Sequence, residues 1–110
     1  MADAEVILES LLDELKVDWC DVGWAFGLAV EEAGLAGDAA RDAAIDALDR
    51  GLVDGLLVAG DLGPGGFQPW PERGAAAGAR IRDAWHAQGQ ARPDGSAIGW
   101  LEITDRGRAR

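Results

Sequence analysis

The sequence is poor in the side chains that most often carry enzymatic chemistry. It contains one cysteine (Cys20), one histidine (His86) and two serines, and it has no tyrosine. A single cysteine excludes an internal disulfide, and one histidine with one cysteine cannot supply the usual ligands of a zinc site. We therefore expect no catalytic centre, no metal and no cofactor, and we interpret the chain as a protein that is not an enzyme.

The sequence also lacks a long apolar run and a basic start. No stretch approaches the roughly 18 consecutive apolar residues that a transmembrane helix needs. The first residues are acidic, unlike the positively charged beginning of a secretory signal. Together with the lone cysteine, these features predict a cytoplasmic protein without membrane contact.

Basic residues are scarce, and their distribution is uneven. The chain has 20 acidic and 10 basic residues, a net charge of −10. Residues 1–61 contain 15 acidic and 3 basic residues, whereas residues 62–110 contain 5 and 7. Such a surface repels a nucleic-acid backbone. We therefore expect a protein partner or a homo-oligomer rather than nucleic acid.

Apolar residues at helical spacing predict three helices in the first half. The first covers residues 3–15, and the second runs from residue 18 or 21 to residue 34. The third begins at Asp38, a good N-cap, and ends at Gly51, which is placed to close it in the left-handed conformation. Trp24 and Leu28 lie off the main stripe of the second helix, which predicts burial on two sides.

The second half predicts two strands and one more helix. We expect a strand over residues 52–57 or 52–58, a loop at 60–66, a helix over 71–88 and a strand over 98–104. Glycine and proline favour the loop because they disrupt regular structure. The two strands should pair antiparallel, since neither has another good partner. The predicted fold is therefore a single α+β domain, mostly helical, with a three-helix core, a small antiparallel sheet and one extra helix.

Two short motifs in this order resemble the winged-helix family. Gly51-Leu52-Val53 is similar to the step from the third helix of that family into its first wing strand. Ile103-Thr104-Asp105-Arg106-Gly107 is similar to the end of its second wing strand. The resemblance covers residues 5–58 and 98–107, with residues 59–97 as an insertion between the strands. It implies a third helix that reads the DNA major groove.

The third helix has the wrong chemistry for that role. Its outward positions include Asp42, Asp46 and Asp49, which would face phosphates. We therefore interpret the chain as a non-catalytic interaction or regulatory module, of which antitoxin-like and immunity-like proteins are examples. The alternative is a winged-helix DNA-binding regulator that uses the arginines of the second half, which are Arg73, Arg80, Arg82 and Arg92.

Five tryptophans in 110 residues are unusually many. We expect Trp19, Trp85 and Trp100 in the core, because each contributes a large buried area. Trp70 lies between two prolines and beside Phe67, either as a lid that pins the insertion or as an exposed anchor for a partner. The candidate partner-binding residues are Phe67, Trp70, Asp42, Asp46 and Asp49.

Overall fold

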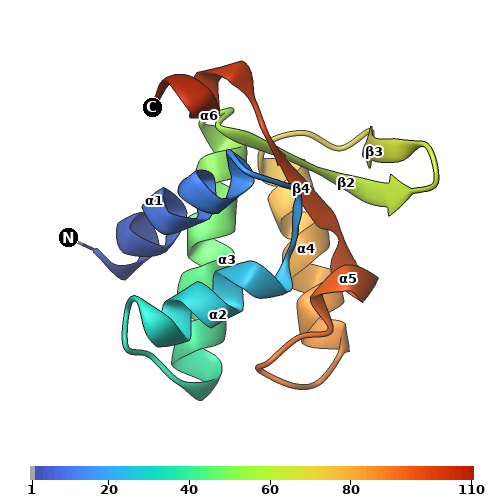
Figure 1. Cartoon of the computed structure of the whole chain (residues 1–110). Helices are drawn as coiled ribbons and strands as arrows, with labels where there is room; N and C mark the ends of the chain where they lie inside the picture. The colour runs from blue at the N-terminus through green and yellow to red at the C-terminus, as the bar shows by residue number, and fades with distance from the viewer. Residues whose placement is uncertain (1) are drawn as a thin grey trace.

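The computed structural model describes residues 2–110, and within them the chain forms six helices and one four-stranded antiparallel sheet (Figure 1). In chain order the elements are α1 (Asp3–Leu15), β1 (Cys20–Asp21), α2 (Gly23–Glu31), α3 (Gly37–Val53), β2 (Leu57–Gly63), β3 (Gly66–Pro69), α4 (Ala75–Ala87), α5 (Gly95–Ile98), β4 (Trp100–Ile103) and α6 (Asp105–Ala109). The predicted class, α+β and mostly helical with a small antiparallel sheet, is confirmed.

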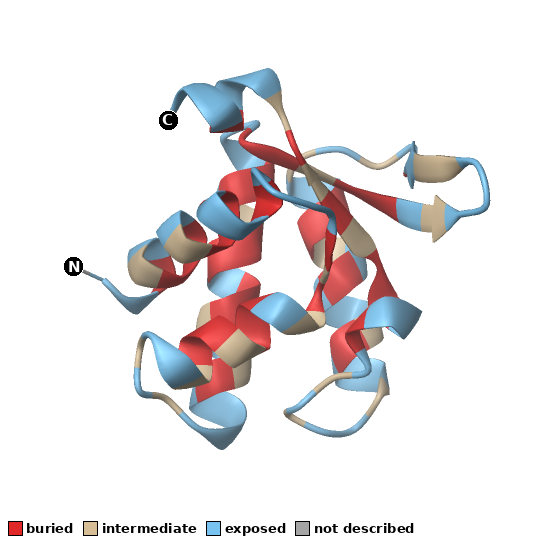
Figure 2. Ribbon diagram, in the orientation of Figure 1, coloured by how far each residue is buried: buried red, intermediate tan, exposed pale blue. Residues whose placement is uncertain are grey.

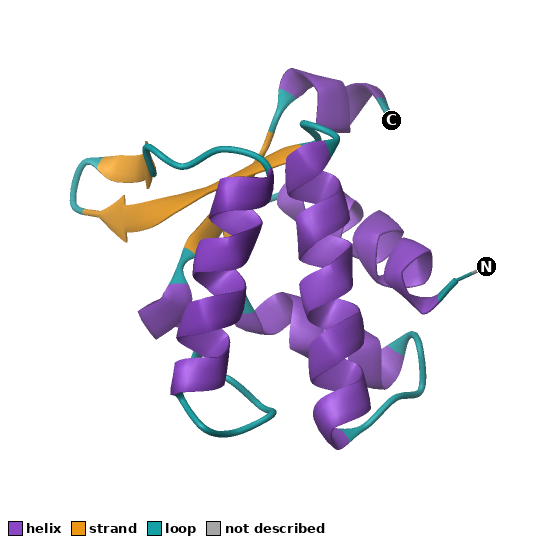
Figure 3. Cartoon of the chain, turned by 180° about the vertical axis from the view of Figure 1, so that it is seen from behind, coloured by secondary structure: helices purple, strands orange, loops and turns teal. Residues whose placement is uncertain are grey.

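The core lies where the helices face one another and the inner side of the sheet. The predicted apolar stripe of α1 is buried, and the buried sides of α1, α2 and α3 face one another in Figure 2. Trp85 of α4 is fully buried, as predicted, and its ring lies 6.3 Å from that of Phe26. Figure 3 shows α3 and α4 side by side, with the strands behind them. Among residues 2–110, no helix is both long and apolar enough to cross a membrane.

The sheet has the strand order β1-β4-β2-β3. Strands β2 and β4 pair antiparallel, with Leu57 opposite Ile103 and Gly60 opposite Trp100. The predicted pairing is right in its direction and in its last strand, but it is wrong for most of the first strand, because residues 52 and 53 belong to α3. Strand β1 was not predicted. It has two residues, which is too short for an alternating pattern to reveal.

Several predicted boundaries around α3 are wrong. The helix does not end at Gly51 but continues to Val53, and the left-handed glycine is Gly55, with φ of +70°. A Cβ atom at Gly51 would lie 2.8 Å from Leu57 Cδ2, so this glycine serves close packing inside the core. The strand consequently begins at Leu57, later than predicted. At the other end the N-cap is Ala36, and Asp38 lies in the first turn.

The second helix also differs from its prediction. It ends at Glu31 rather than at residue 34. Leu28 is buried, but Trp24 is 47% exposed, so the predicted burial on two sides is wrong at Trp24. At the start of the helix, Asp21 Oδ1 accepts a hydrogen bond from the Gly23 N–H at 2.8 Å.

The predicted loop at residues 60–66 is instead most of a β-hairpin. Leu62 pairs with Phe67 and Gly63 with Gly66, around a two-residue turn at Pro64 and Gly65. Proline in the turn costs the ladder no hydrogen bond. Glycine and proline here therefore shape a tight hairpin rather than end the strand.

The last third contains more helix than predicted. Helix α4 begins at Ala75 rather than at residue 71, and residues 95–98, expected as linker and strand, form α5. Thr104, expected as the end of a strand, is the N-cap of α6. Its Oγ1 accepts from the Gly107 N–H at 3.0 Å and donates to the Gly55 carbonyl at 2.6 Å.

Candidate functional site

The outer face of the sheet carries three aromatic residues that reach solvent. Side chains alternate between the two faces of a strand, and Leu57, Ala59, Leu101 and Ile103 are the buried, inward set. The outward set of the three longer strands includes Val58, Leu62, Phe67, Trp100 and Glu102. Trp19, immediately before β1, joins this set because its Nε1 donates to Glu102 Oε2 at 3.0 Å. We call Trp19, Phe67 and Trp100 the aromatic platform.

Gly60 makes the platform possible. A Cβ atom at this position would lie 2.8 Å from Phe67 Cζ and 2.3 Å from the carbonyl oxygen of Gln68. The missing side chain lets the Phe67 ring lie across β2. There it stacks with Trp19, with ring centroids 6.4 Å apart and planes inclined by 20°. Trp100 is paired with Gly60 from the other side, so Phe67 and Trp100 meet at one glycine, and Trp19 joins them through its stack on Phe67.

The platform is open to solvent. Trp19 is 40% exposed, and Phe67 and Trp100 are half-buried. Helices α1 to α4 occupy the other side of the sheet (Figures 1 and 3). The prediction that Trp19 is a core residue is therefore wrong, and Trp100 is only half-buried.

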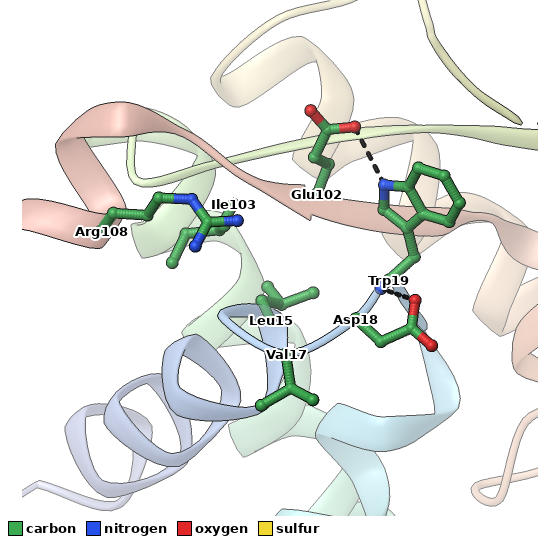
Figure 4. A pocket seen from close by; sticks show the side chains of 7 residues that line it. All are labelled: Leu15, Val17, Asp18, Trp19, Glu102, Ile103 and Arg108. Carbon is green, nitrogen blue, oxygen red and sulfur yellow. Dashed lines mark hydrogen bonds between the residues drawn. The ribbon is translucent and has the colours of Figure 1, made fainter.

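A cleft of about 340 Å³ adjoins the platform beneath Trp19 (Figure 4). Its apolar lining comes from Leu15, Val17 and Ile103, and its polar lining from Asp18, Glu102 and Arg108. Val17 is 86% exposed, so its aliphatic side chain adds apolar surface next to the exposed indole of Trp19. The cleft extends the apolar surface of the platform toward the end of α1.

Carboxylates hold the platform in place and set its charge. Asp18 Oδ1 accepts from the Trp19 N–H at 2.7 Å, and Glu102 accepts from the indole of the same residue. Asp21 lies opposite Trp100 on the neighbouring strand. Each carboxylate has a second oxygen, which can accept a hydrogen bond from a binding partner. The surface is therefore apolar with an acidic rim.

Trp70 is a structural residue in this arrangement. It is 2% exposed, its Nε1 donates to Asp61 Oδ1 at 3.1 Å, and the guanidinium of Arg80 lies 3.7 Å above its ring. A Cβ atom at Gly99 would approach the indole to 2.6 Å. Trp70 thus pins the hairpin against α4 and β4, in line with the lid interpretation and not with an exposed anchor.

Two of the three predicted acidic residues of α3 are paired with arginines. Asp42 contacts Arg41 at 2.9 Å and Asp46 contacts Arg50 at 3.3 Å. Asp49 is half-buried and lies against α4, where its Oδ1 would be 2.3 Å from a Cβ atom at Gly78. A groove of about 260 Å³ lies between the two helices, and its lining joins all three aspartates with Arg82 and His86 of α4. The structure therefore separates these aspartates from Phe67, which lies in the sheet.

Three of the four arginines considered for DNA binding make contacts within the chain. Arg80 stacks on Trp70 and pairs with Glu72 at 2.8 Å, an interaction that lowers the pKa of the Glu72 carboxyl. Arg73 donates to the carbonyl of Trp70, and Arg92 lies 4.8 Å above the Phe26 ring.

The single cysteine lies beside the platform but is shielded from solvent. Cys20 is buried, and desolvation, followed by the charges of Glu14, Asp21 and Asp18, raises the pKa of its thiol to about 11. Within residues 2–110, no group of three histidine, cysteine or carboxylate side chains is arranged to hold a metal ion.

Comparison of the chain with protein-family models, with curated proteins and with solved structures finds no match. Of the predicted partner-binding residues, only Phe67 belongs to the aromatic platform. Sequence reasoning missed Trp19 and Trp100. The alternation of Trp100 and Glu102 with Leu101 and Ile103 in β4 is a signal that could have placed Trp100 on the outer face. No local signal places Trp19 there, because β1 has only two residues.

Proposed function

We propose that this chain is a non-catalytic protein-interaction module and that the aromatic platform is its binding surface. The observation that carries the proposal is the stacked pair of Trp19 and Phe67, which lies beside Trp100 on the outer face of the sheet and is exposed to solvent. Tryptophan is enriched at binding hot spots, because a large ring contributes much buried area when a partner covers it. The hydrogen bond to Glu102 fixes the Trp19 ring before binding, which reduces the entropy lost on association.

The charge of this surface favours protein over nucleic acid. Open sheets that bind single-stranded nucleic acid combine stacking aromatics with a positively charged groove. Here the neighbours are Asp18, Asp21 and Glu102, and Arg108 is the basic residue among those lining the adjoining cleft. A partner with apolar and basic side chains complements this pattern.

We also propose that the architecture is winged-helix-like. The chain order α1, β1, α2, α3 and β2 supports this assignment. So does the later strand β4, which pairs between β1 and β2. The DNA-binding alternative has less support, because α4 packs along α3, the helix that would enter the major groove. Arg73, Arg80 and Arg92 of the second half are also engaged in contacts within the chain.

The partner class is consistent with regulatory, antitoxin-like and immunity-like proteins, each of which acts by binding another protein. We propose a cytoplasmic location, supported by the single buried cysteine. A second copy of the chain is the other candidate partner, and sedimentation analysis of the purified protein distinguishes it from a different protein.

Quantitative affinity capture from the source organism tests the proposal. The bait is compared with a double variant, Trp19→Ser with Trp100→Ser, and with Val53→Ser, which removes an exposed apolar residue from the end of α3, away from the platform. We expect a protein captured by the wild type and by Val53→Ser that falls about tenfold or more with the double variant. Melting curves establish that all three baits are folded. Identical capture by all three, or no specific capture by the wild type, contradicts the proposal.

A further inference from the structure

A second exposed tryptophan marks a separate groove on α2. Trp24 is 47% exposed and borders a groove of about 400 Å³, whose apolar floor includes Leu28. None of the aromatic residues of the platform lines this groove. Asp21 is shared by the groove and the rim of the platform, because it lines the groove and lies opposite Trp100 in the sheet. The groove and the platform are therefore neighbours with different aromatic residues.

Gly27, in the middle of α2, keeps the groove open. It lines the groove, and a Cβ atom there would meet nothing within 4 Å. Its φ is not positive, so neither backbone conformation nor internal packing requires glycine. Glycine at such a position costs a helix about 1 kcal/mol relative to alanine. The one structural effect of its missing side chain is the open space between Trp24 and Glu31.

The groove has an uncompensated negative charge. Its lining contains Glu14, Asp21, Glu31 and Glu32 and no basic residue. Within the described part of the chain, none of these four carboxylates lies within 4.0 Å of a basic group, whereas Asp42 and Asp46 of α3 do. Four close carboxylates around an apolar floor complement a ligand that combines positive charge with an apolar side chain.

We propose that this groove binds a basic amphipathic segment of another protein. An arginine of that segment stacks on the Trp24 ring and reaches Glu31 and Glu32, and an adjacent apolar side chain lies over Gly27 on Leu28. Arginine suits the site better than lysine, because its planar guanidinium stacks on an indole while donating to carboxylates. This second site has residues of its own and extends the proposed function by naming a ligand class.

Synthetic peptides test the ligand class directly. The probe is a fluorescein-labelled amphipathic peptide of about 15 residues, with arginine on one face and leucine on the other. Matched peptides carry lysine for arginine, glutamate for arginine or serine for leucine. By fluorescence anisotropy we expect the arginine peptide to have the highest affinity, the lysine peptide a lower one and the serine variant the lowest. We expect no binding of the glutamate peptide and weaker binding of the others at higher salt. Equal binding of the leucine and serine peptides overturns the proposal, since it indicates charge attraction alone.

Variants of the protein locate the site. We expect Trp24→Ala, Gly27→Leu and the pair Glu31→Gln with Glu32→Gln each to weaken the arginine peptide about tenfold or more. Gly27→Leu is decisive, because it fills the groove while adding a good helix former where nothing else is packed. The controls are Trp19→Ala and the pair Asp42→Asn with Asp46→Asn, which should change the affinity less than about twofold.

Two further results overturn the inference. One is absence of measurable binding of the arginine peptide to the wild type. The other is an equal loss of affinity in the groove variants and the controls, which indicates general attraction to an acidic protein. The proposed function is tested separately, through Trp19 and Trp100, so failure of the peptide to bind rejects the groove without bearing on the platform.

Discussion

The ring of Trp19, which leads into one edge strand of the sheet, stacks with the ring of Phe67 from the opposite edge strand. The two meet over the outer face because Gly60, in β2, one of the two strands between them, has no side chain. Contacts across a sheet ordinarily join neighbouring strands. This stack instead joins the chain just after α1 to the hairpin in the second half, and it places an ordered apolar surface where no helix covers it.

Replacement of Trp70 should show that the hairpin depends on it. We expect Trp70→Ala to lower the free energy of unfolding by about 3 to 5 kcal/mol, the usual cost of removing a large buried aromatic side chain. Trp70→Phe keeps a ring beneath Arg80 but loses the hydrogen bond to Asp61, and we expect a smaller loss of about 1 to 2 kcal/mol. Urea denaturation measures both. If Trp70→Ala unfolds at the wild-type urea concentration, the ring does not pin the hairpin.

Two glycines in helices should respond oppositely to the same substitution. Gly51→Ala places a methyl group 2.8 Å from Leu57 and 2.9 Å from Leu8, so we expect a loss of about 1 to 3 kcal/mol from overpacking. Gly27→Ala meets nothing within 4 Å, so we expect a gain of about 0.5 to 1 kcal/mol from helix propensity. Thermal or chemical unfolding of the matched pair checks this. Equal changes in both variants would falsify the packing described for α3.

These glycines also show where sequence reasoning succeeds and fails. The spacing of Leu8 and its neighbours predicted α1 to its exact residues, because one long amphipathic stripe leaves few alternatives. Gly51 was mistaken for a helix end, because a glycine required by tertiary packing looks the same in sequence as one required by a left-handed turn. Gly60 was assigned to a loop for a similar reason, although it allows Phe67 to cross the sheet.

The candidate site was harder to predict than the fold class. Phe67 was recognised beside Trp70, but only the folded hairpin separates the two, with Trp70 inside and Phe67 on the outer face. Trp19 was assigned to the core because large aromatic residues usually are buried. Its exposure follows from the pairing of β1 with β4. That pairing joins segments far apart in the chain, so the local sequence pattern does not reveal it.

The Cys20 thiol should be unreactive in the folded protein. Burial and the nearby carboxylates raise its pKa from 9.0 to about 11, so the thiol stays protonated at pH 8. We expect alkylation by iodoacetamide to be slow in buffer and fast in urea, as followed by mass spectrometry. Rapid alkylation in buffer, at the rate of the unfolded chain, is the contrary result.

The same shift gives a pH dependence with a definite sign. Between pH 9 and about 11 the unfolded thiol loses its proton while the folded thiol retains it. The folded state then binds more protons, so its stability falls as the pH rises through this window. Cys20→Ala should remove that part of the decline. The test is unfolding of both proteins across the window, and parallel curves for the two contradict the assignment.

The protein should not bind duplex DNA through charge. Helix α4 lies along α3, the net charge is −10, and Arg73, Arg80 and Arg92 are engaged within the chain. We expect no change in the anisotropy of a labelled random duplex at low micromolar protein and about 100 mM salt. Binding that weakens steeply with added salt is the signature of phosphate neutralisation and would establish the DNA-binding alternative.

Site-specific photo-crosslinking tests the central claim, that the platform meets a protein partner. A photoreactive amino acid replaces Pro69, an exposed residue at the edge of the platform, or Ala87, an exposed residue at the end of α4. Irradiation in cells should give a discrete adduct from position 69 that is absent from position 87 and is lost when Trp19→Ser is added to the same chain. An adduct that is equal at both positions, or that persists without the Trp19 ring, contradicts the claim.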